Sequence, residues 1–251
     1  MAAQDLQAAK VLIERCAATG VKAVCEGVDF ALLATRKAVG GQMITINTPS
    51  GRLDEIYLPL IGEHMARNAA LAVAAVHSFY QGRLPSDEIL ADGLSSVKAD
   101  GRIELIDSQP ALVIDTAHNP HGVRATLEAV ESNYLAQPLI VVLGMMADKA
   151  VDDVVQCIAQ SADMIIATTI VDNERALGAE ALAHICSEYL SPARVESASD
   201  PVMAVEKARH YMLSNGCEDG LILVVGSVYL AGYVRDHCYK ANERITISQS
   251  E

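Results

Sequence analysis

The chain has 251 residues, of which 51% are hydrophobic, so it can bury a sizeable core in one or two domains. A formal net charge of −13 argues against a nucleic-acid-binding surface, because such a surface needs clustered Lys and Arg to neutralise phosphates. The sequence has no apolar run of the roughly 18 residues that a membrane span needs, no signal-peptide pattern and no Cys/His spacing typical of zinc, so we expect a soluble, cytoplasmic protein with reduced cysteines.

The first hundred residues predict helices around a hairpin. Apolar residues recur at helical spacing, and a dense run of alanine supports a closely packed helix, so helices are expected at 5–19, 69–76 and 85–94. Alternating or β-branched segments predict strands at 21–25, 43–46 and 56–58. Gly20 is a candidate C-cap, and the turn residues of 48–51 make the last two strands a hairpin.

A short linker at 98–101 precedes a regular alternation of strand and helix. Strands are expected at 103–106, 112–115, 139–143, 164–167, 194–196 and 221–225, with helices in most of the gaps. This alternation predicts an α/β fold with a Rossmann-like, largely parallel sheet that helices cover on both faces.

One stretch, 111–121, is the clearest candidate for a site. Four apolar residues predict a strand buried on both faces, and the strand ends in Asp115, with His118 and Asn119 in the following turn. In open α/β sheets ligands bind beyond the carboxyl ends of strands, where the next helix offers free N–H groups. The alternative is a turn that only caps a helix.

Two further strand ends carry polar or glycine signals. They are 144–149, which includes Asp148 and Lys149, and 226–232, which begins Gly226-Ser227. Tight packing between a strand and its following helix would also require Gly226-Ser227, so a structural role is an equal alternative there.

These pieces, in this order and spacing, resemble the folylpolyglutamate synthase and dihydrofolate synthase family of the Mur-ligase superfamily. The matching motifs are Leu60-Ile61-Gly62-Glu63-His64 with Arg67-Asn68-Ala69, Gly101-Arg102-Ile103-Glu104, Asp115-Thr116-Ala117-His118-Asn119-Pro120, Asp148-Lys149 and Gly226-Ser227-Val228-Tyr229-Leu230. The resemblance covers nearly the whole chain. It implies that residues 1–98 are the end of the family's central ATP-binding domain and that residues 101–251 are its C-terminal domain.

The resemblance also implies site residues and ligands. Asn68 would contact the adenine of ATP, Arg102 its phosphates and Asp115 its ribose, and Arg102 would assist catalysis. His118 would share in catalysis and lie with Ser227 and Tyr229 at the glutamate or folate side. The expected ligands are ATP, glutamate and folate or dihydropteroate, and the expected state is a monomer with no nucleic-acid or membrane partner. Magnesium would be held mainly by residues preceding this sequence, and no metal ligand is assigned within it.

Four departures from the family pattern stand out. The family usually has Gln at Met65, Pro at Asp100 and Gly at Thr116. The sequence also contains no G-x-x-x-x-G-K-[ST] loop to hold the β- and γ-phosphates. It therefore resembles the C-terminal part of a longer ligase, and we expect it to be inactive alone.

The family's chemistry explains why such residues are needed. A carboxylate is a poor electrophile, so ATP first phosphorylates it, and the amine of glutamate then displaces phosphate to form an amide. Positioning and charge neutralisation dominate phosphoryl transfer, which is the role open to Arg102. The structural alternative for Arg102 is a surface ion pair with Glu104 or Asp100, worth at most about 1 kcal/mol.

Two other classes of function compete with a ligase. Asp115, His118 and His121 could ligate the divalent ion of a metal-dependent hydrolase, although no further Asp/His set at the strand ends completes such a site. A non-catalytic nucleotide- or folate-binding module would not need the phosphate loop. The sequence does not decide between folate and dihydropteroate as the acceptor.

Overall fold

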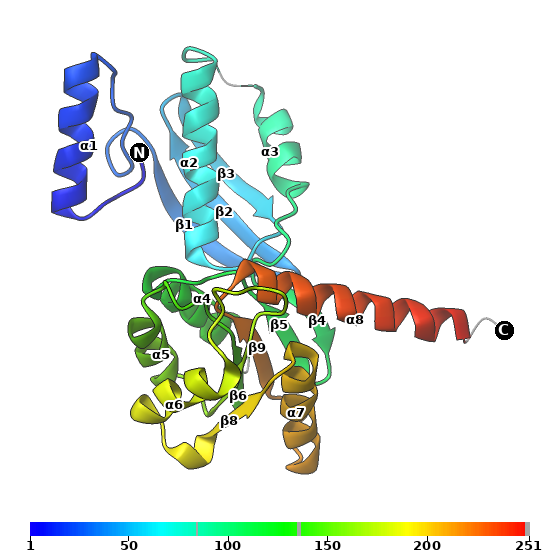
Figure 1. The fold of residues 1–251 in the computed structure, drawn as a ribbon. Coiled ribbons are helices and arrows are strands. Elements are labelled where there is room, and N and C mark those ends of the chain that lie inside the picture. The colour runs from blue at the N-terminus through cyan, green and yellow to red at the C-terminus, as the bar shows by residue number, and fades with distance from the viewer. Residues whose placement is uncertain (84, 135–136, 249–251) are drawn as a thin grey trace. The chain divides into compact units, whose positions relative to one another are not determined.

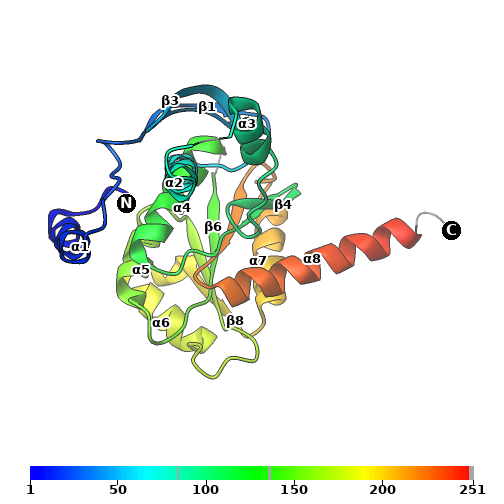
Figure 2. The same cartoon turned by 90° about the horizontal axis from the view of Figure 1, so that it is seen from above.

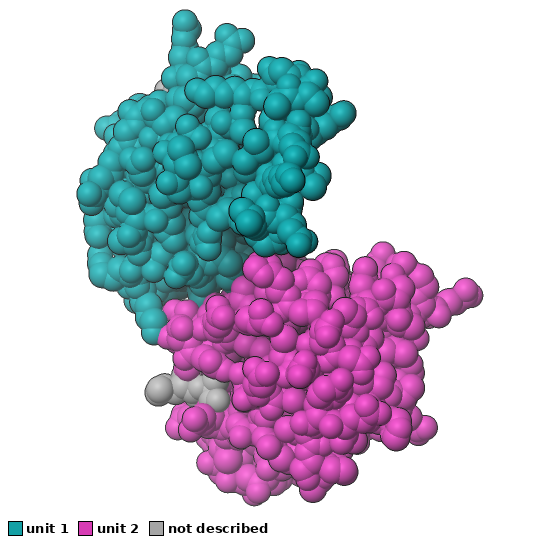
Figure 3. Space-filling model, turned by 90° about the vertical axis from the view of Figure 1, so that its left-hand side faces the viewer, with its two compact units in different colours: residues 1–99 teal, residues 100–251 magenta. Residues whose placement is uncertain are grey.

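The computed structural model describes the backbone of residues 1–83, 85–134 and 137–248, and the side chains of these residues up to Tyr239. The chain divides into two compact units, Met1–Ala99 and Asp100–Glu251, which Figure 3 colours separately. Within the described residues no helix is long and apolar enough to cross a membrane.

The first unit is built on a three-stranded antiparallel sheet in the order β1-β2-β3 (Figure 1). Its elements are α1 (Leu6–Thr19), β1 (Ala31–Ala38), β2 (Gly41–Thr48), β3 (Gly51–Leu58), α2 (Glu63–Phe79) and α3 (Asp87–Ser95). Apolar residues of the strands meet the alanine-rich face of α2 and two leucines of α3 to form the core of this unit. Small alanine side chains let α2 lie close to the sheet.

The structure confirms most of the elements predicted for the first unit. Asp5 and Gly20 cap the first helix, and the hairpin is β2 and β3. The strand predicted at 21–25 is wrong, because this segment finds no partner strand. Two of its backbone groups have other partners instead: Val24 O accepts a hydrogen bond from Met1 N, and Cys25 N donates to Asp29 Oδ2 at 2.7 Å. The edge strand β1 is a further element, which the sequence pattern does not predict.

The second unit is a six-stranded sheet in the order β4-β5-β9-β6-β7-β8, in which only β4 runs antiparallel to its neighbour. The strands are β4 (Glu104–Ser108), β5 (Ala111–Ile114), β6 (Leu139–Leu143), β7 (Met164–Thr168), β8 (Val195–Ala198) and β9 (Leu221–Val225). The helices are α4 (Pro120–Asn133), α5 (Val151–Ala159), α6 (Ala179–Tyr189), the 3₁₀ turn η1 (Pro192–Arg194), α7 (Pro201–Ser214) and α8 (Val228–Ser248).

Helices cover both faces of this sheet. Figures 1 and 2 show α4, α5 and α6 side by side on one face, with α7 and α8 on the other. Every residue of the central strands β6 and β9 is buried, as expected for parallel strands covered on both sides. The predicted Rossmann-like, largely parallel α/β fold is confirmed.

Candidate active site

The loops that follow β5, β9 and β6 come together at the carboxyl edge of the sheet in the second unit. The sheet order places β9 between β5 and β6, so three loops far apart in sequence become neighbours. Two backbone hydrogen bonds join them: Gly226 N donates to Ala117 O at 2.8 Å, and Gly144 N donates to Val225 O at 3.3 Å. This edge is where an open α/β sheet binds its ligands.

Asp115 lies at the centre of this edge and is only 1% exposed. Its Oδ1 accepts hydrogen bonds from Ala117 N at 2.7 Å and from Thr126 Oγ1 at 3.0 Å. Its Oδ2 accepts one from Ile103 N at 3.0 Å. Three protein donors explain how a carboxylate can stay buried, and since a carboxylate oxygen can accept two hydrogen bonds, Oδ2 keeps one acceptor position.

Arg102 lies on the loop that Asp115 holds, and its side chain is exposed. The structural alternative considered for Arg102, an ion pair with Asp100 or Glu104, is not what the structure has. Among the described side chains Arg102 makes no ion pair, because both carboxylates pair with Arg235 of α8 instead. Its charge therefore faces solvent without a partner from the described part of the chain.

His118 is half-buried, and its Nδ1 lies 3.0 Å from Thr116 O. A carbonyl oxygen can only accept, so we assign the ring hydrogen to Nδ1, which leaves the lone pair of a neutral ring on Nε2. His118 therefore offers an oriented acceptor that can take a proton from an amine.

Ser227 precedes α8, Tyr229 lies in its first turn, and the two residues differ in exposure. Ser227 is buried, and its Oγ accepts a hydrogen bond from Tyr229 N at 3.1 Å, so it caps the helix. Gly226 has φ +111°, and a Cβ there would lie 2.6 Å from Gly144 O, so glycine is needed where the loops after β9 and β6 meet. These contacts favour a structural role for Gly226-Ser227, whereas the exposed Tyr229 ring is free to meet a ligand.

A cavity of about 150 Å³ joins several of these residues. His118, Ser227 and Tyr229 line it together with two cationic residues, Lys149 and Arg175. The structure thus brings together the three residues predicted for the substrate side.

The charge around this cavity is positive. Asp148 Oδ2 lies 3.9 Å from Lys149 Nζ and 3.8 Å from Arg175 Nη1, and all three side chains are well exposed. Exposed pairs at such distances contribute about 0–1 kcal/mol. Two cations therefore share one carboxylate, and the N-terminus of α8 adds its positive dipole end, so the cavity suits an anionic ligand.

Sequence reasoning assigns no role to Lys149 or Arg175. Lys149 belongs to a strand end whose polar character is visible in the sequence. Arg175 follows β7, in a turn where Asn173 Oδ1 accepts from Arg175 N at 3.1 Å. The loop is held beside the one after β6 because Ala147 N donates to Arg175 O at 2.8 Å and Leu177 N donates to Met145 O at 2.9 Å. The sequence signal that could have identified Lys149 and Arg175 is that each lies among polar residues that follow a buried strand.

Asn68 lies in the first unit, exposed on α2. The preceding residue, Arg67, donates from Nε to Glu26 Oε1 at 2.8 Å, and that carboxylate also accepts from Ala3 N. The hydrogen bond from Arg67 holds the pKa of Glu26 below its usual range, despite the opposing effect of burial. The first turns of α2 are thus tied to the segment that precedes β1.

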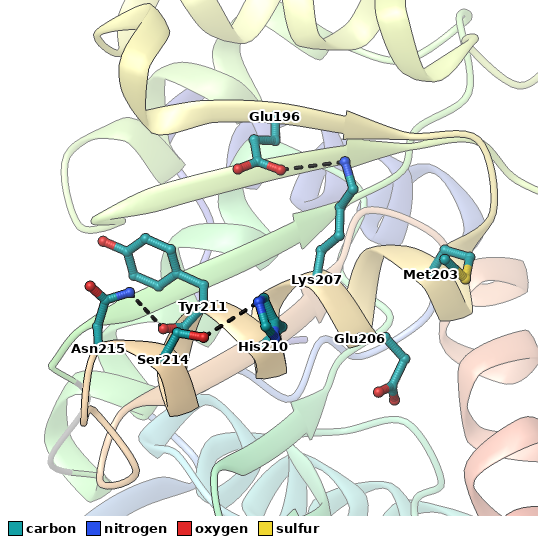
Figure 4. A pocket seen from close by; sticks show the side chains of 8 residues that line it. All are labelled: Glu196, Met203, Glu206, Lys207, His210, Tyr211, Ser214 and Asn215. Carbon is teal, nitrogen blue, oxygen red and sulfur yellow. Dashed lines mark hydrogen bonds and ion pairs between the residues drawn. The ribbon is translucent and has the colours of Figure 1, made fainter.

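A second, larger hollow of about 440 Å³ lies on α7 and the edge strand β8 (Figure 4). Four of its polar side chains are paired with one another: Lys207 Nζ lies 3.4 Å from Glu196 Oε2, and Ser214 Oγ lies 3.4 Å from His210 Nε2. None of the predicted site residues lines it, so it does not belong to the candidate site.

The metal-hydrolase alternative gains no support from the geometry. Among the side chains of residues 1–83, 85–134 and 137–239, no group of three or more His, Cys, Asp or Glu could hold a metal ion. Asp115 in particular is oriented by the donors Ile103 N, Ala117 N and Thr126 Oγ1, and it forms no such group with His118 and His121.

Comparison with known proteins gives one family. Residues 101–228 match the family described as Mur ligase, glutamate ligase domain. A dihydrofolate synthase/folylpolyglutamate synthase of Mycobacterium tuberculosis is 32% identical over 239 residues, which are 90% of this chain and 49% of that protein. A folylpolyglutamate synthase of Lacticaseibacillus casei is 26% identical over 230 residues, which are 91% of this chain and 51% of that protein.

Solved structures agree with these matches. Mycobacterium tuberculosis folylpolyglutamate synthase complexed with ADP is similar with a TM-score of 0.90 and 31% identity, over 94% of this chain and 53% of that one. The chain thus spans about half the length of the relatives it matches.

Proposed function

Because the chain belongs to the Mur ligase family with a glutamate ligase domain, we propose that it is the C-terminal part of an ATP-dependent ligase that adds glutamate to folate or dihydropteroate. The observation that carries this proposal is the cationic cavity beside His118, which suits an amino acid with two carboxylates. Residues 1–98 would then be the end of the ATP-binding central domain, and 101–251 the C-terminal domain.

The proposed reaction has two steps. A carboxylate oxygen of the acceptor attacks the γ-phosphorus of ATP, the bond to the bridging oxygen breaks and ADP leaves. The glutamate amine then attacks the acyl carbon, phosphate leaves with the oxygen that carried it, and the amine loses a proton. His118 Nε2 is the proposed acceptor of that proton, and Lys149 and Arg175 are the proposed ligands of the glutamate carboxylates.

In the proposed nucleotide site, Asn68 contacts the adenine, Arg102 the phosphates and Asp115 the ribose. The free guanidinium of Arg102 supports its role, as does the remaining acceptor position on Asp115 Oδ2. Magnesium would neutralise phosphate charge during transfer, but the described residues offer no set of ligands for it, so we assign it no step here.

Binding experiments on the 251-residue chain test these assignments. We expect Arg175→Gln to weaken glutamate binding about tenfold and to leave ADP binding unchanged. We expect Arg102→Ala to weaken ADP binding about tenfold and to leave glutamate binding unchanged. Arg194→Gln is the matched control, since Arg194 is a partly exposed arginine of the same unit that hydrogen-bonds Ala162 O and Asp163 O, away from the cavity. Unchanged binding in both site variants would reject the site.

We also expect the chain alone to form no ADP that depends on folate and glutamate, because its sequence has no phosphate loop. Activity should arise when the chain is fused to the N-terminal half of the Mycobacterium tuberculosis relative, and His118→Ala should remove it. Binding of nucleotide and folate without turnover in that fusion would favour the non-catalytic module instead.

A further inference from the structure

The loop that carries Arg102 has a strained backbone. The φ angles of its two neighbours are +68° at Gly101 and +48° at Ile103, both in the left-handed region. That region is unfavourable for a β-branched residue such as Ile, and it persists only where surrounding contacts impose it. A Cβ on Gly101 would lie 2.7 Å from Thr116 Cγ2, so the first position also requires glycine.

Hydrogen bonds hold the backbone on both sides of Arg102. Gly101 N donates to Glu104 Oε2 at 2.7 Å, and Thr116 N donates to Gly101 O at 2.9 Å. On the other side, Ile103 N donates to Asp115 Oδ2 at 3.0 Å. The conformation of the loop therefore depends on where the carboxylates of Glu104 and Asp115 are fixed.

Arg235 of α8 fixes one of these carboxylates. Its Nε donates to Glu104 Oε1 at 2.9 Å and to Oε2 at 3.2 Å, and its Nη2 lies 3.3 Å from Asp100 Oδ2. Tyr239 OH donates to Glu104 Oε1 at 3.1 Å, and Arg235 Cζ lies 4.9 Å from the centroid of the Tyr239 ring. We call Asp100, Glu104, Arg235 and Tyr239 the α8 clamp.

The clamp has a second consequence for Arg102. Asp100 and Glu104 are the acidic residues nearest to Arg102 in the sequence, and either would be a natural ion-pair partner for it. Both are occupied by Arg235, and Arg102 has no ion pair with any described residue. Within the part of the chain that the structure describes, its positive charge stays available.

We propose that Arg235 is a positioning residue for Arg102. By pairing with Asp100 and Glu104 it fixes the loop 101–103 and keeps both carboxylates from neutralising Arg102, which leaves the guanidinium free to bind the phosphates of a nucleotide. The inference rests on the proposed function in one respect, namely that the anion is a nucleotide phosphate.

Variants of the 251-residue chain test this inference. Arg235→Gln removes the charge, Arg235→Lys retains it, and Arg209→Gln is the control. Arg209 Nη1 pairs with Asp107 Oδ2 at 2.9 Å, so it also joins a helix to β4, but it does not contact the loop 101–103. Hydrogen exchange of the Gly101 and Ile103 amides reports the loop, and titration with ADP reports anion binding.

We expect Arg235→Gln to accelerate hydrogen exchange of both amides about tenfold and to weaken ADP binding about tenfold. This factor corresponds to the loss of one charged hydrogen bond. Arg235→Lys should recover most of both effects, and Arg209→Gln should change neither. Adding Arg235→Gln to Arg102→Ala should alter ADP binding by less than about twofold, since Arg235 acts through Arg102.

The proposal is overturned if Arg235→Gln leaves both amides as protected as before. It is also overturned if the substitution weakens ADP binding as much in the Arg102→Ala background as in the native one. If Arg102→Ala alone has no effect, or the native chain binds no ADP, the nucleotide role of Arg102 fails. Amide exchange then decides on its own whether Arg235 fixes the loop.

Discussion

At the scale of single residues, the site depends on two carboxylates, those of Asp115 and Glu104, whose hydrogen bonds hold the backbone around Arg102. The sequence predicts Asp115 as a ligand contact, and its three protein hydrogen bonds add a structural role, because they join the residue before β4, the loop after β5 and the middle of α4. Glu104 does the same for Gly101. Exposed Arg102 is thus presented by the buried Asp115 and the half-buried Glu104.

Glu104 gives a pH-dependent prediction. Burial alone would raise the pKa of Glu104, but hydrogen bonds from Gly101 N, Arg235 and Tyr239 outweigh it and hold the pKa below the usual 4.5. The stabilisation is therefore complete above pH 4.5 and is lost as pH falls through the lower, folded-state pKa. Glu104→Gln should reduce the free energy of unfolding by about 1 kcal/mol or more at neutral pH.

Urea unfolding of the native chain and Glu104→Gln at several pH values measures this difference. The gap between the two chains should stay constant from pH 7 to about pH 5 and shrink below pH 4.5. A gap that grew on acidification would show that the carboxylate is not stabilised by its partners.

Cys186 gives a second residue-level prediction. Burial in α6 raises the pKa of the Cys186 thiol to about 12, so the reactive thiolate is scarce at pH 8. In the native chain, iodoacetamide should label Cys186 more slowly than half-buried Cys157, as peptide mass spectrometry can follow. In concentrated urea the two should react alike; equal labelling in the native chain would contradict the buried position.

At the scale of elements, the regular part of the fold follows from local sequence. A strand that is buried on both faces has an unbroken apolar sequence. The bounds predicted for β6 and β9 therefore agree with the observed bounds. The strand β1 escapes prediction because its middle is exposed and lacks β-branched alternation. The segment 21–25 alternates, but a strand also needs a partner, and local sequence carries no information about one.

The assembly of the site is less predictable than its parts. Each strand end is visible as a polar break, yet only the sheet order places the loop after β9 between those of β5 and β6. Lys149 and Arg175 join His118 through that order. Arg235 is 131 residues from Glu104, so no local pattern could have paired them.

The central strand β9 should be where the second unit is most sensitive to truncation. Leu223 in β9 is 0% exposed, whereas Leu213 near the end of α7 is 56% exposed. Leu223→Ala should lower the free energy of unfolding by about 2–5 kcal/mol, because it leaves a cavity between covered faces. Leu213→Ala, the same chemical change, should cost about 0.5 kcal/mol or less in urea unfolding. Similar costs for both would contradict the burial of β9.

At the scale of the whole molecule, a net charge of −13 has to coexist with the proposed anionic ligands. The positions of a few cationic side chains explain how an acidic chain can offer sites for anions. Arg102 is kept free of its neighbouring carboxylates, and Lys149 and Arg175 share a single one. Arg102, Lys149 and Arg175 thus supply positive charge at one edge of one sheet, and the N-terminus of α8 adds to it.

The two units also have separate cores, which makes the segment between them the expected site of first cleavage. One core gathers the antiparallel strands with α2 and α3, and the other gathers the parallel strands with α7 and α8. The division falls between Ala99 and Asp100, next to exposed Lys98. A protease needs an exposed, locally unfolded stretch, whereas the backbone beyond this point is held by Glu104 and Asp115.

Brief trypsin treatment should therefore release a stable fragment that begins at Ala99, as intact-mass measurement would show. Lys98→Gln should abolish that fragment and leave other cleavages unchanged. Earlier cleavage after Lys149, within the second unit, would contradict the division.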